Sequence, residues 1–161
     1  MKTFLMLITI VLTNQVQAQY EFQCPKLVGS YGPCVTEPAS QAVAGDLLVT
    51  ISENKLNGYP HFLLKTEQKG QETKELSILA DGSAHPAMLS FGAALGIEAS
   101  MVSACHDHVI DYSMSVKNQL GDTYLTLLTS TRISLSGDQL KIVDVYALNN
   151  YTITRTCPRK K

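Results

Sequence analysis

Apolar and polar residues alternate along much of this chain. Leu47, Val49 and Ile51 fall on one side of an extended segment, and the same period of two runs from His108 to Val116. One face of each segment would be dry and the other solvated, which is typical of strands in an antiparallel sheet. The pattern therefore predicts an all-β protein.

Further segments have the composition of strands and are separated by turn-forming pairs such as Asn57-Gly58 and Asp81-Gly82. About eight strands joined by short hairpins close most economically into one antiparallel up-and-down barrel, because closure removes exposed sheet edges. A two-sheet sandwich is the main alternative. The further strand ranges are Leu27 to Cys34, Tyr59 to Thr66, Glu72 to Leu79, Thr123 to Leu135, Gln139 to Ala147 and Tyr151 to Cys157.

One segment departs from the alternation. Residues 86–104 are rich in Ala, Gly and Ser, and apolar residues recur there at roughly helical spacing, namely Met88, Phe91, Leu95, Ala99 and Val102. Glycines within it each cost a helix up to about 1 kcal/mol, which leaves open a loop with a turn or two of helix. We expect a helical or loop insertion here, either packed on the barrel or forming a lid over its mouth.

The first residues form a secretory signal peptide, residues 1–18. Lys2 provides a basic start, Phe4 to Leu12 is almost entirely apolar, and Val16-Gln17-Ala18 fits a cleavage site. The apolar run is much shorter than the roughly 20 residues that span a bilayer, so we expect no membrane span after cleavage. The mature barrel domain, residues 19–161, is therefore predicted to be secreted or periplasmic.

All 4 cysteines lie in this mature domain, and an even count in an exported chain predicts two disulfides. Several pairings are possible, and we favour Cys24 with Cys157 and Cys34 with Cys105. The first bond would join the two ends of the domain and stabilise it by on the order of 4 to 5 kcal/mol in the loop-entropy model. The cysteines are too widely spaced for a structural zinc site.

Charge argues against nucleic acid as a partner. The whole chain has a formal net charge of -1, and removal of Lys2 with the leader leaves 12 basic against 14 acidic residues. A mature domain with this small negative charge has no basic field that would attract nucleic acid.

Catalytic signatures are not found in the sequence. No serine stands in a Gly-x-Ser-x-Gly elbow, and no glycine-rich segment has phosphate-loop spacing. Cys105-His106-Asp107-His108 is the densest polar cluster, and on a strand His106 and His108 would share a face, as paired metal ligands do. A third ligand is not evident, so a metal-dependent enzyme using these histidines ranks behind non-catalytic functions. We expect no cofactor.

Two polar residues near the C-terminus have alternative interpretations. Asp144 lies on the same face of its strand as Ile142 and Tyr146. Either that face is solvated, or Asp144 points inward and needs a partner such as Arg155. Asn150-Tyr151-Thr152 matches a glycosylation acceptor, although a turn that merely uses two asparagines is the simpler interpretation.

The two ends of the domain resemble the lipocalins. Leu27-Val28-Gly29-Ser30-Tyr31 is similar to the motif in which a Gly-x-Trp on the first strand closes the barrel base. Arg155 resembles the last-strand arginine that packs over that tryptophan. Tyr31 would replace the tryptophan, since the chain has none, and its ring can stack with a guanidinium. The resemblance implies a calycin-like barrel closed by Gly29, Tyr31 and Arg155.

Such a barrel implies a secreted non-catalytic protein that binds a small apolar or amphipathic ligand. A protein-interaction or inhibitor module with a filled core is the alternative, and both arrangements are physically possible at this barrel size. The oligomeric state does not follow from these patterns. Candidate ligand contacts, chosen as amphipathic rings and a flexible thioether, are Tyr112, Met114, Tyr124, Tyr146 and Tyr151.

Overall fold

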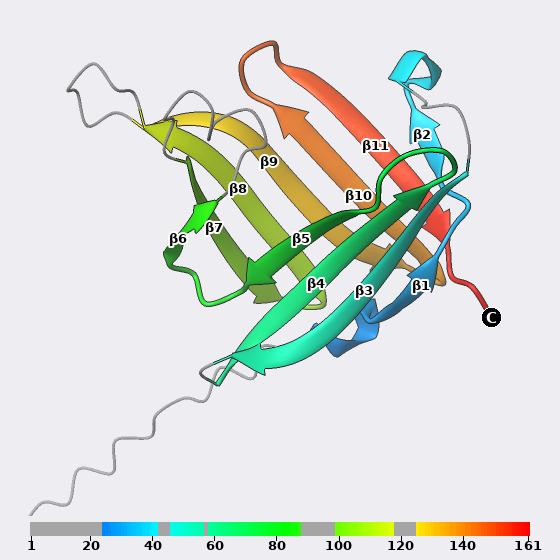
Figure 1. Cartoon of the computed structure of the whole chain (residues 1–161), viewed down its shortest axis with the longest axis horizontal. Helices are drawn as coiled ribbons and strands as arrows, with labels where there is room; N and C mark the ends of the chain where they lie inside the picture. Colours follow the sequence, from blue (N-terminus) through cyan, green and yellow to red (C-terminus); the bar gives the residue numbers. More distant parts are fainter. Residues whose placement is uncertain (1–23, 42–45, 57, 88–98, 118–124) are drawn as a thin grey trace, which may run out of the picture.

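The computed structural model describes residues 24–41, 46–56, 58–87, 99–117 and 125–161. These residues form two antiparallel sheets that face each other (Figure 1). The prediction of an all-β antiparallel protein is confirmed. The first sheet has the order β1 (Gly29–Tyr31), β3 (Leu47–Leu56), β4 (Tyr59–Gln68), β5 (Lys74–Leu79).

The second sheet is larger, and most of its strands follow one another as a meander. Its order is β2 (Val35–Glu37), β11 (Tyr151–Pro158), β10 (Gln139–Tyr146), β9 (Leu125–Ser136), β8 (Val109–Lys117), β7 (Ala99–His106), β6 (Ala84–Ala87). Two short 3-10 helices, η1 (Pro25–Leu27) and η2 (Ala39–Gln41), flank the β1–β2 segment.

The apolar–polar alternation in the sequence matches an alternation of buried and exposed residues along the strands. On β3, Val49 and Ile51 are buried while Thr50 and Ser52 are exposed. Side chains that point inward from both sheets meet in one apolar core, which includes Phe62 of β4 and Ile133 of β9. Burial of these rows against each other holds the two sheets face to face.

The structure has more strands than the sequence predicted. The first expected strand, Leu27 to Cys34, contains β1, which pairs with β3, and ends just before β2, which was not predicted and pairs with β11. Gly32 has a φ of 121°, and a Cβ atom there would lie 2.8 Å from the carbonyl oxygen of Leu47. Only glycine permits this approach, so the chain can leave one sheet and enter the other at this residue.

The helical or loop insertion expected over residues 86–104 is wrong at both of its ends. Pro86 and Ala87 belong to β6, and Ala99 to Ala104 belong to β7. Pairing of β7 along the whole of β8 overrides the weak local preferences of alanine and serine. The central part of the predicted insertion, residues 88–98, lies outside the described residues.

The two sheets are linked differently along their two sides. On one side the β1–β2 segment pairs with both sheets, and Tyr31 also forms a bridge with Arg159. On the other side, within the described residues, β5 and β6 share no ladder. Ser103 of β7 links the two sheets there instead, because its hydroxyl donates to the carbonyl oxygen of Leu79 of β5 at 2.6 Å. A fully closed barrel remains a prediction.

The disulfides pair differently from the prediction. Cys24 bonds to Cys105 and Cys34 bonds to Cys157, at sequence separations of 81 and 123. The register explains the second bond, since Val35 of β2 lies opposite Thr156 of β11 and places the preceding and following residues side by side. The first and last strand regions are therefore tied together, but through Cys34 rather than Cys24.

The residue that packs over Tyr31 also differs from the prediction. The guanidinium of Arg159, not of Arg155, lies 5.3 Å from the centroid of the Tyr31 ring. Tyr31 is fully buried and its hydroxyl donates to the carbonyl oxygen of Leu27 at 2.7 Å. Arg155 lies on the inward face of β11 opposite Ile142, too far along the strand to reach Tyr31.

Gly29 lies against the same contact. A Cβ atom at Gly29 would lie 3.4 Å from both the Arg159 Nε atom and the Tyr31 hydroxyl, and the backbone φ of 153° is rarely adopted by other residues. Arg159 Nη2 donates to the Tyr31 hydroxyl at 2.9 Å and to the carbonyl oxygens of Lys26 and Val28 at 2.6 and 3.0 Å. We call Gly29, Tyr31 and Arg159 the base cluster.

Candidate functional site

A cavity of about 350 Å³ lies between the two sheets. Its apolar wall comes from both sheets, with Val49, Leu64 and Leu76 on one side and Ile142 on the other. These positions alternate with outward-facing residues on their strands, so the sequence period that builds the sheets also builds the wall. The remaining lining residues are Cys34, Thr36, Gln41, Leu47, Thr66, Gln68, Gln71, Glu72, Lys74, Glu75, Tyr112, Asp144 and Arg155.

The cavity has an exposed end and a buried end. Gln41 of η2 and Gln71 and Glu72 of the β4–β5 connection are exposed, whereas Ile142 and Asp144 of β10 are buried. The β4–β5 connection and the β2–η2 region are found on the same side of the molecule in Figure 1. A ligand would therefore enter between these two segments and reach inward to β10.

An ion pair between buried Asp144 and half-buried Arg155 forms the polar centre of the cavity. Asp144 is 8% exposed, and its two carboxylate oxygens accept from the Thr131 hydroxyl at 2.6 Å and from Nη1 of Arg155. The alternation left open whether Asp144 faces solvent or points inward to Arg155. The structure shows the inward arrangement, with the partner that a buried carboxylate needs.

Tyr112 extends this polar centre onto a fourth strand. Its side chain is hydrogen-bonded to Thr131, and burial raises the pKa of the Tyr112 phenol to about 12. Tyr112, Thr131, Asp144 and Arg155 come from β8, β9, β10 and β11 in that order. The neutral Tyr112 phenol donates to Thr131, because the Thr131 proton is already given to Asp144, and the phenol oxygen can accept a hydrogen bond inside the cavity.

The structure brings only part of the predicted ligand set to this cavity. Of the described candidates, Tyr112 lines it, and Met114 lies two residues further along β8, half-buried. Tyr146 and Tyr151 lie opposite each other with ring centroids 6.5 Å apart, outside the lining. Tyr124 lies outside the described residues.

Other lining residues were missed by the sequence analysis. Leu64 and Leu76 lie opposite each other on β4 and β5, and Thr36 lies opposite Arg155 on β2 and β11. Their alternation shows that they face inward, but it cannot show whether an inward position meets a filled core or a hollow one.

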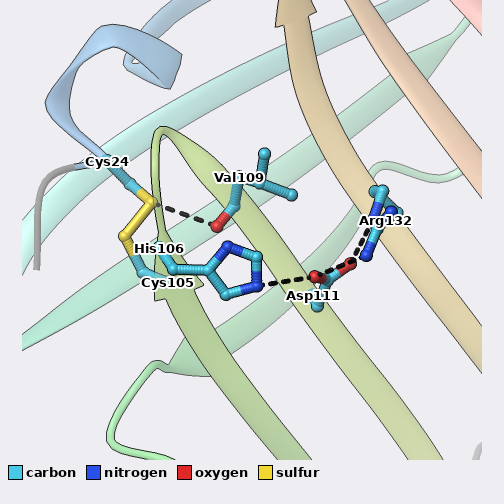
Figure 2. A network of polar contacts seen from close by, with 6 residues as sticks. All are labelled: Cys24, Cys105, His106, Val109, Asp111 and Arg132. Carbon is cyan, nitrogen blue, oxygen red and sulfur yellow. Dashed lines mark hydrogen bonds and ion pairs between the residues drawn. A yellow bond between two sulfur atoms is a disulfide. The ribbon is translucent and has the colours of Figure 1, made fainter.

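The histidine cluster is arranged differently from a metal site. Asp107 and His108 have φ values of 46° and 63° and form the turn between β7 and β8, so His106 and His108 do not share a strand face. His106 Nε2 instead lies 3.0 Å from Asp111, which also accepts from Arg132 (Figure 2). In the described part of the chain, no group of three His, Cys, Asp or Glu side chains could hold a metal ion.

Two further findings concern the helices and the disulfides. The described helices include none that is long and apolar enough to cross a bilayer. Both disulfides are formed, which fits an oxidising compartment outside the cytosol.

Comparison with known proteins identifies the fold but no family. No family model and no curated protein matches the sequence. A solved structure described as the REP1-NXSQ fatty acid transporter has a TM-score of 0.56 at 11% identity, over 84% of this chain and 97% of that one. Secretory abundant heat soluble protein 4 from Ramazzottius varieornatus has a TM-score of 0.51 at 15% identity, over 84% and 95%.

These matches support a calycin-like fold. The identities are too low to carry more than the fold, so the function of this chain depends on the chemistry of its own cavity.

Proposed function

We propose that this chain is a secreted, non-catalytic calycin-like protein that holds a small amphipathic ligand between its two sheets. The observation that carries the proposal is the cavity of about 350 Å³. Apolar side chains wall it and a small set of convergent polar groups lies at its buried end. This combination is typical of small-molecule binding sites, which are commonly about 300 to 1,000 Å³ in volume.

The same cavity disfavours the alternative of an interaction module with a filled core. A core packed to ordinary density would leave few voids larger than a water molecule. The cavity is also continuous with exposed residues of the β4–β5 connection, so a ligand could reach it without unfolding. The match to a protein described as a fatty acid transporter further favours a ligand with an apolar chain.

Several roles assigned from the sequence are part of this proposal. Tyr112 contacts the ligand directly, and Met114, Tyr124, Tyr146 and Tyr151 extend the contact surface for longer ligands. Gly29 and Tyr31 close the barrel base, with Arg159 in the role first assigned to Arg155. Cleavage after Ala18 releases the mature domain outside the cytosol.

Binding of a neutral dye tests the proposal. Nile red should bind the mature protein saturably, and Leu76→Trp should weaken binding by about tenfold or more because the indole occupies the cavity. Val102→Trp is the matched control, since Val102 is 41% exposed on the outward face of β7. Native mass spectrometry of protein purified from its own compartment should show a retained small molecule.

Two results would overturn the proposal. One is the absence of saturable dye binding by the unmodified protein. The other is an equal loss of binding in the Leu76→Trp and Val102→Trp variants, which would place the dye on the outer surface.

A further inference from the structure

We propose that the cavity selects amphipathic ligands with an uncharged polar head group, such as a hydroxyl or an amide, over the corresponding carboxylates. The inference rests on the proposed function, because it names the ligand class of the same cavity. The observation behind it is that the cation at the inner end of the cavity, Arg155, already has a carboxylate partner, Asp144, supplied by the protein.

Among the described lining residues, the buried end of the cavity offers no unpaired cation to an anionic head group. The acidic lining residues are Glu72, Glu75 and Asp144, and the basic ones are Lys74 and Arg155. The pair at the buried end is neutral as a unit, and the exposed end carries more acid than base. An ionised carboxylate would therefore meet Asp144 at short range in a medium where charge repulsion is poorly screened.

Binding of a ligand carboxylate would not become favourable if it displaced the Asp144 carboxylate from Arg155. Arg155 would exchange one carboxylate for another, and Asp144 would be left buried with only the Thr131 hydroxyl as partner. An unpaired buried charge is strongly unfavourable. The protein's own ion pair therefore competes directly with any acidic ligand.

A neutral head group meets no such competition. The contact with Asp144 uses Nη1 of Arg155 and leaves the other guanidinium nitrogens able to donate toward the cavity. Tyr112 offers a neutral hydroxyl beside Thr131. A hydroxyl or amide both donates and accepts, so it can be satisfied at this position while its chain lies against Val49, Leu64 and Leu76.

The direct test uses two ligands with the same chain. Displacement of Nile red by dodecan-1-ol and by sodium dodecanoate is measured at pH 7.5 on the unmodified protein, below the critical aggregation concentration of each ligand. We expect dodecan-1-ol to bind about tenfold tighter than dodecanoate. A difference of this size is typical when at least one polar group of the weaker ligand lacks a suitable partner in the site. This comparison needs no variant, so it remains decisive if a variant fails to fold.

Charge variants then locate the selectivity. Asp144→Asn leaves Arg155 without its counter-charge and should shift the preference toward dodecanoate by about tenfold or more. Adding Arg155→Gln removes the free cation and should restore the preference for the alcohol. Asp111→Asn is the matched control, because Asp111 pairs with Arg132 away from the cavity (Figure 2) and should leave both affinities unchanged.

The outcomes separate this inference from the proposed function. Saturable binding with dodecanoate preferred by the unmodified protein would overturn the inference and leave the binding function intact. An Asp144→Asn variant that folds and keeps the preference for the alcohol would also overturn it. Failure of the unmodified protein to bind either ligand or the dye would overturn both.

Discussion

Arg155 and Arg159 lie four residues apart near the C-terminus, yet they act at two different places in the molecule. Arg159 covers Tyr31 in the base cluster and donates to three oxygens, two of them backbone carbonyls. Arg155 lies in the cavity, pairs with Asp144 and has open space beside it. Nη2 of Arg159 is held by three protein oxygens, whereas Arg155 pairs with one carboxylate and borders the open volume of the cavity.

The difference separates a structural site from a binding site that uses the same residue types. Each arginine lies near a tyrosine, the fully buried Tyr31 in one case and the half-buried Tyr112 in the other. In the base cluster the tyrosine hydroxyl has both a donor and an acceptor supplied by the protein. In the cavity the tyrosine belongs to a chain of polar groups that ends at open volume, where a ligand can complete it.

The Cys34–Cys157 bond lies between these two sites, and its removal should have the largest effect. Cys157 is two residues from each arginine, and Cys34 itself lines the cavity. Its sequence separation of 123 corresponds to about 5 kcal/mol of stability in the loop-entropy model. We expect Cys34→Ser with Cys157→Ser to lower the free energy of unfolding by about that amount and to weaken Nile red binding.

The other disulfide provides the control. Cys24→Ser with Cys105→Ser opens a loop of 81 residues, and the loop-entropy model gives a loss of similar size, about 4 to 5 kcal/mol. Neither of these cysteines lines the cavity, so the folded fraction should keep its dye affinity. Urea unfolding followed by dye titration measures both quantities. Equal losses of dye affinity in the two double cysteine variants would contradict the division into a structural base cluster and a ligand-binding cavity.

Alkaline unfolding should distinguish the cavity tyrosine. Burial raises the pKa of Tyr112 to about 12 from 10.0. The stability that this gives is fully present below pH 10 and is lost as the pH rises through 12, because the unfolded chain releases the proton first. The unmodified protein should therefore lose about 2 to 3 kcal/mol more than Tyr112→Phe between about pH 9 and 12. Urea unfolding at each pH checks this, and parallel curves would contradict it.

Removal of the other tyrosine hydroxyl should act at neutral pH. Tyr31→Phe deletes a buried donor to the Leu27 carbonyl oxygen and an acceptor for Arg159. We expect it to destabilise the protein by about 1 to 3 kcal/mol at pH 7 without changing dye affinity. Tyr112→Phe at the same pH should change dye affinity more than stability, since Thr131 keeps its bond to Asp144. A larger change of dye affinity in Tyr31→Phe and of stability in Tyr112→Phe would contradict the roles given to the two sites.

The fold was largely predictable because its strands follow an apolar–polar alternation with a period of two, which can be seen in the sequence. Val49 and Ile51 alternate with Thr50 and Ser52, and this alone indicates which face is buried. β7 was missed because its alternation uses small residues such as Ala104 and Ser103, whose local preferences do not favour a strand. Its strand character comes from pairing with β8 over its whole length.

The site was predictable only in part, for a different reason. Alternation left two arrangements open for Asp144, a solvated face or an inward position with a partner such as Arg155, and the structure shows the second. The sequence could not show which arginine reaches Tyr31, because that depends on how far β11 runs past β2 and where the chain bridges to β1. The disulfide pairing was wrong for the same reason, since the register of β2 against β11 decides it.

The smallest effect should come from the carboxylate and arginine pair on the outside of the molecule. Asp111 accepts from Arg132 Nε at 2.7 Å and from Arg132 Nη2 at 3.1 Å, the geometry of a good ion pair. The Arg132 side chain is 63% exposed, against 25% for Arg155 and 12% for Asp144. Water and salt screen exposed pairs, so their net contribution to folding is small however good the geometry.

We therefore expect Asp111→Asn to change the melting temperature much less than Asp144→Asn, although both variants remove one carboxylate charge from an arginine. The small change in Asp111→Asn should shrink further in high salt, whereas the loss in Asp144→Asn should persist because salt does not reach a buried pair. Melting curves of both variants in low and high salt measure this. A larger loss of stability in Asp111→Asn would mean that burial does not determine how much the Asp144–Arg155 pair contributes to folding. Competition between Asp144 and an acidic ligand for Arg155 would then lose its physical basis.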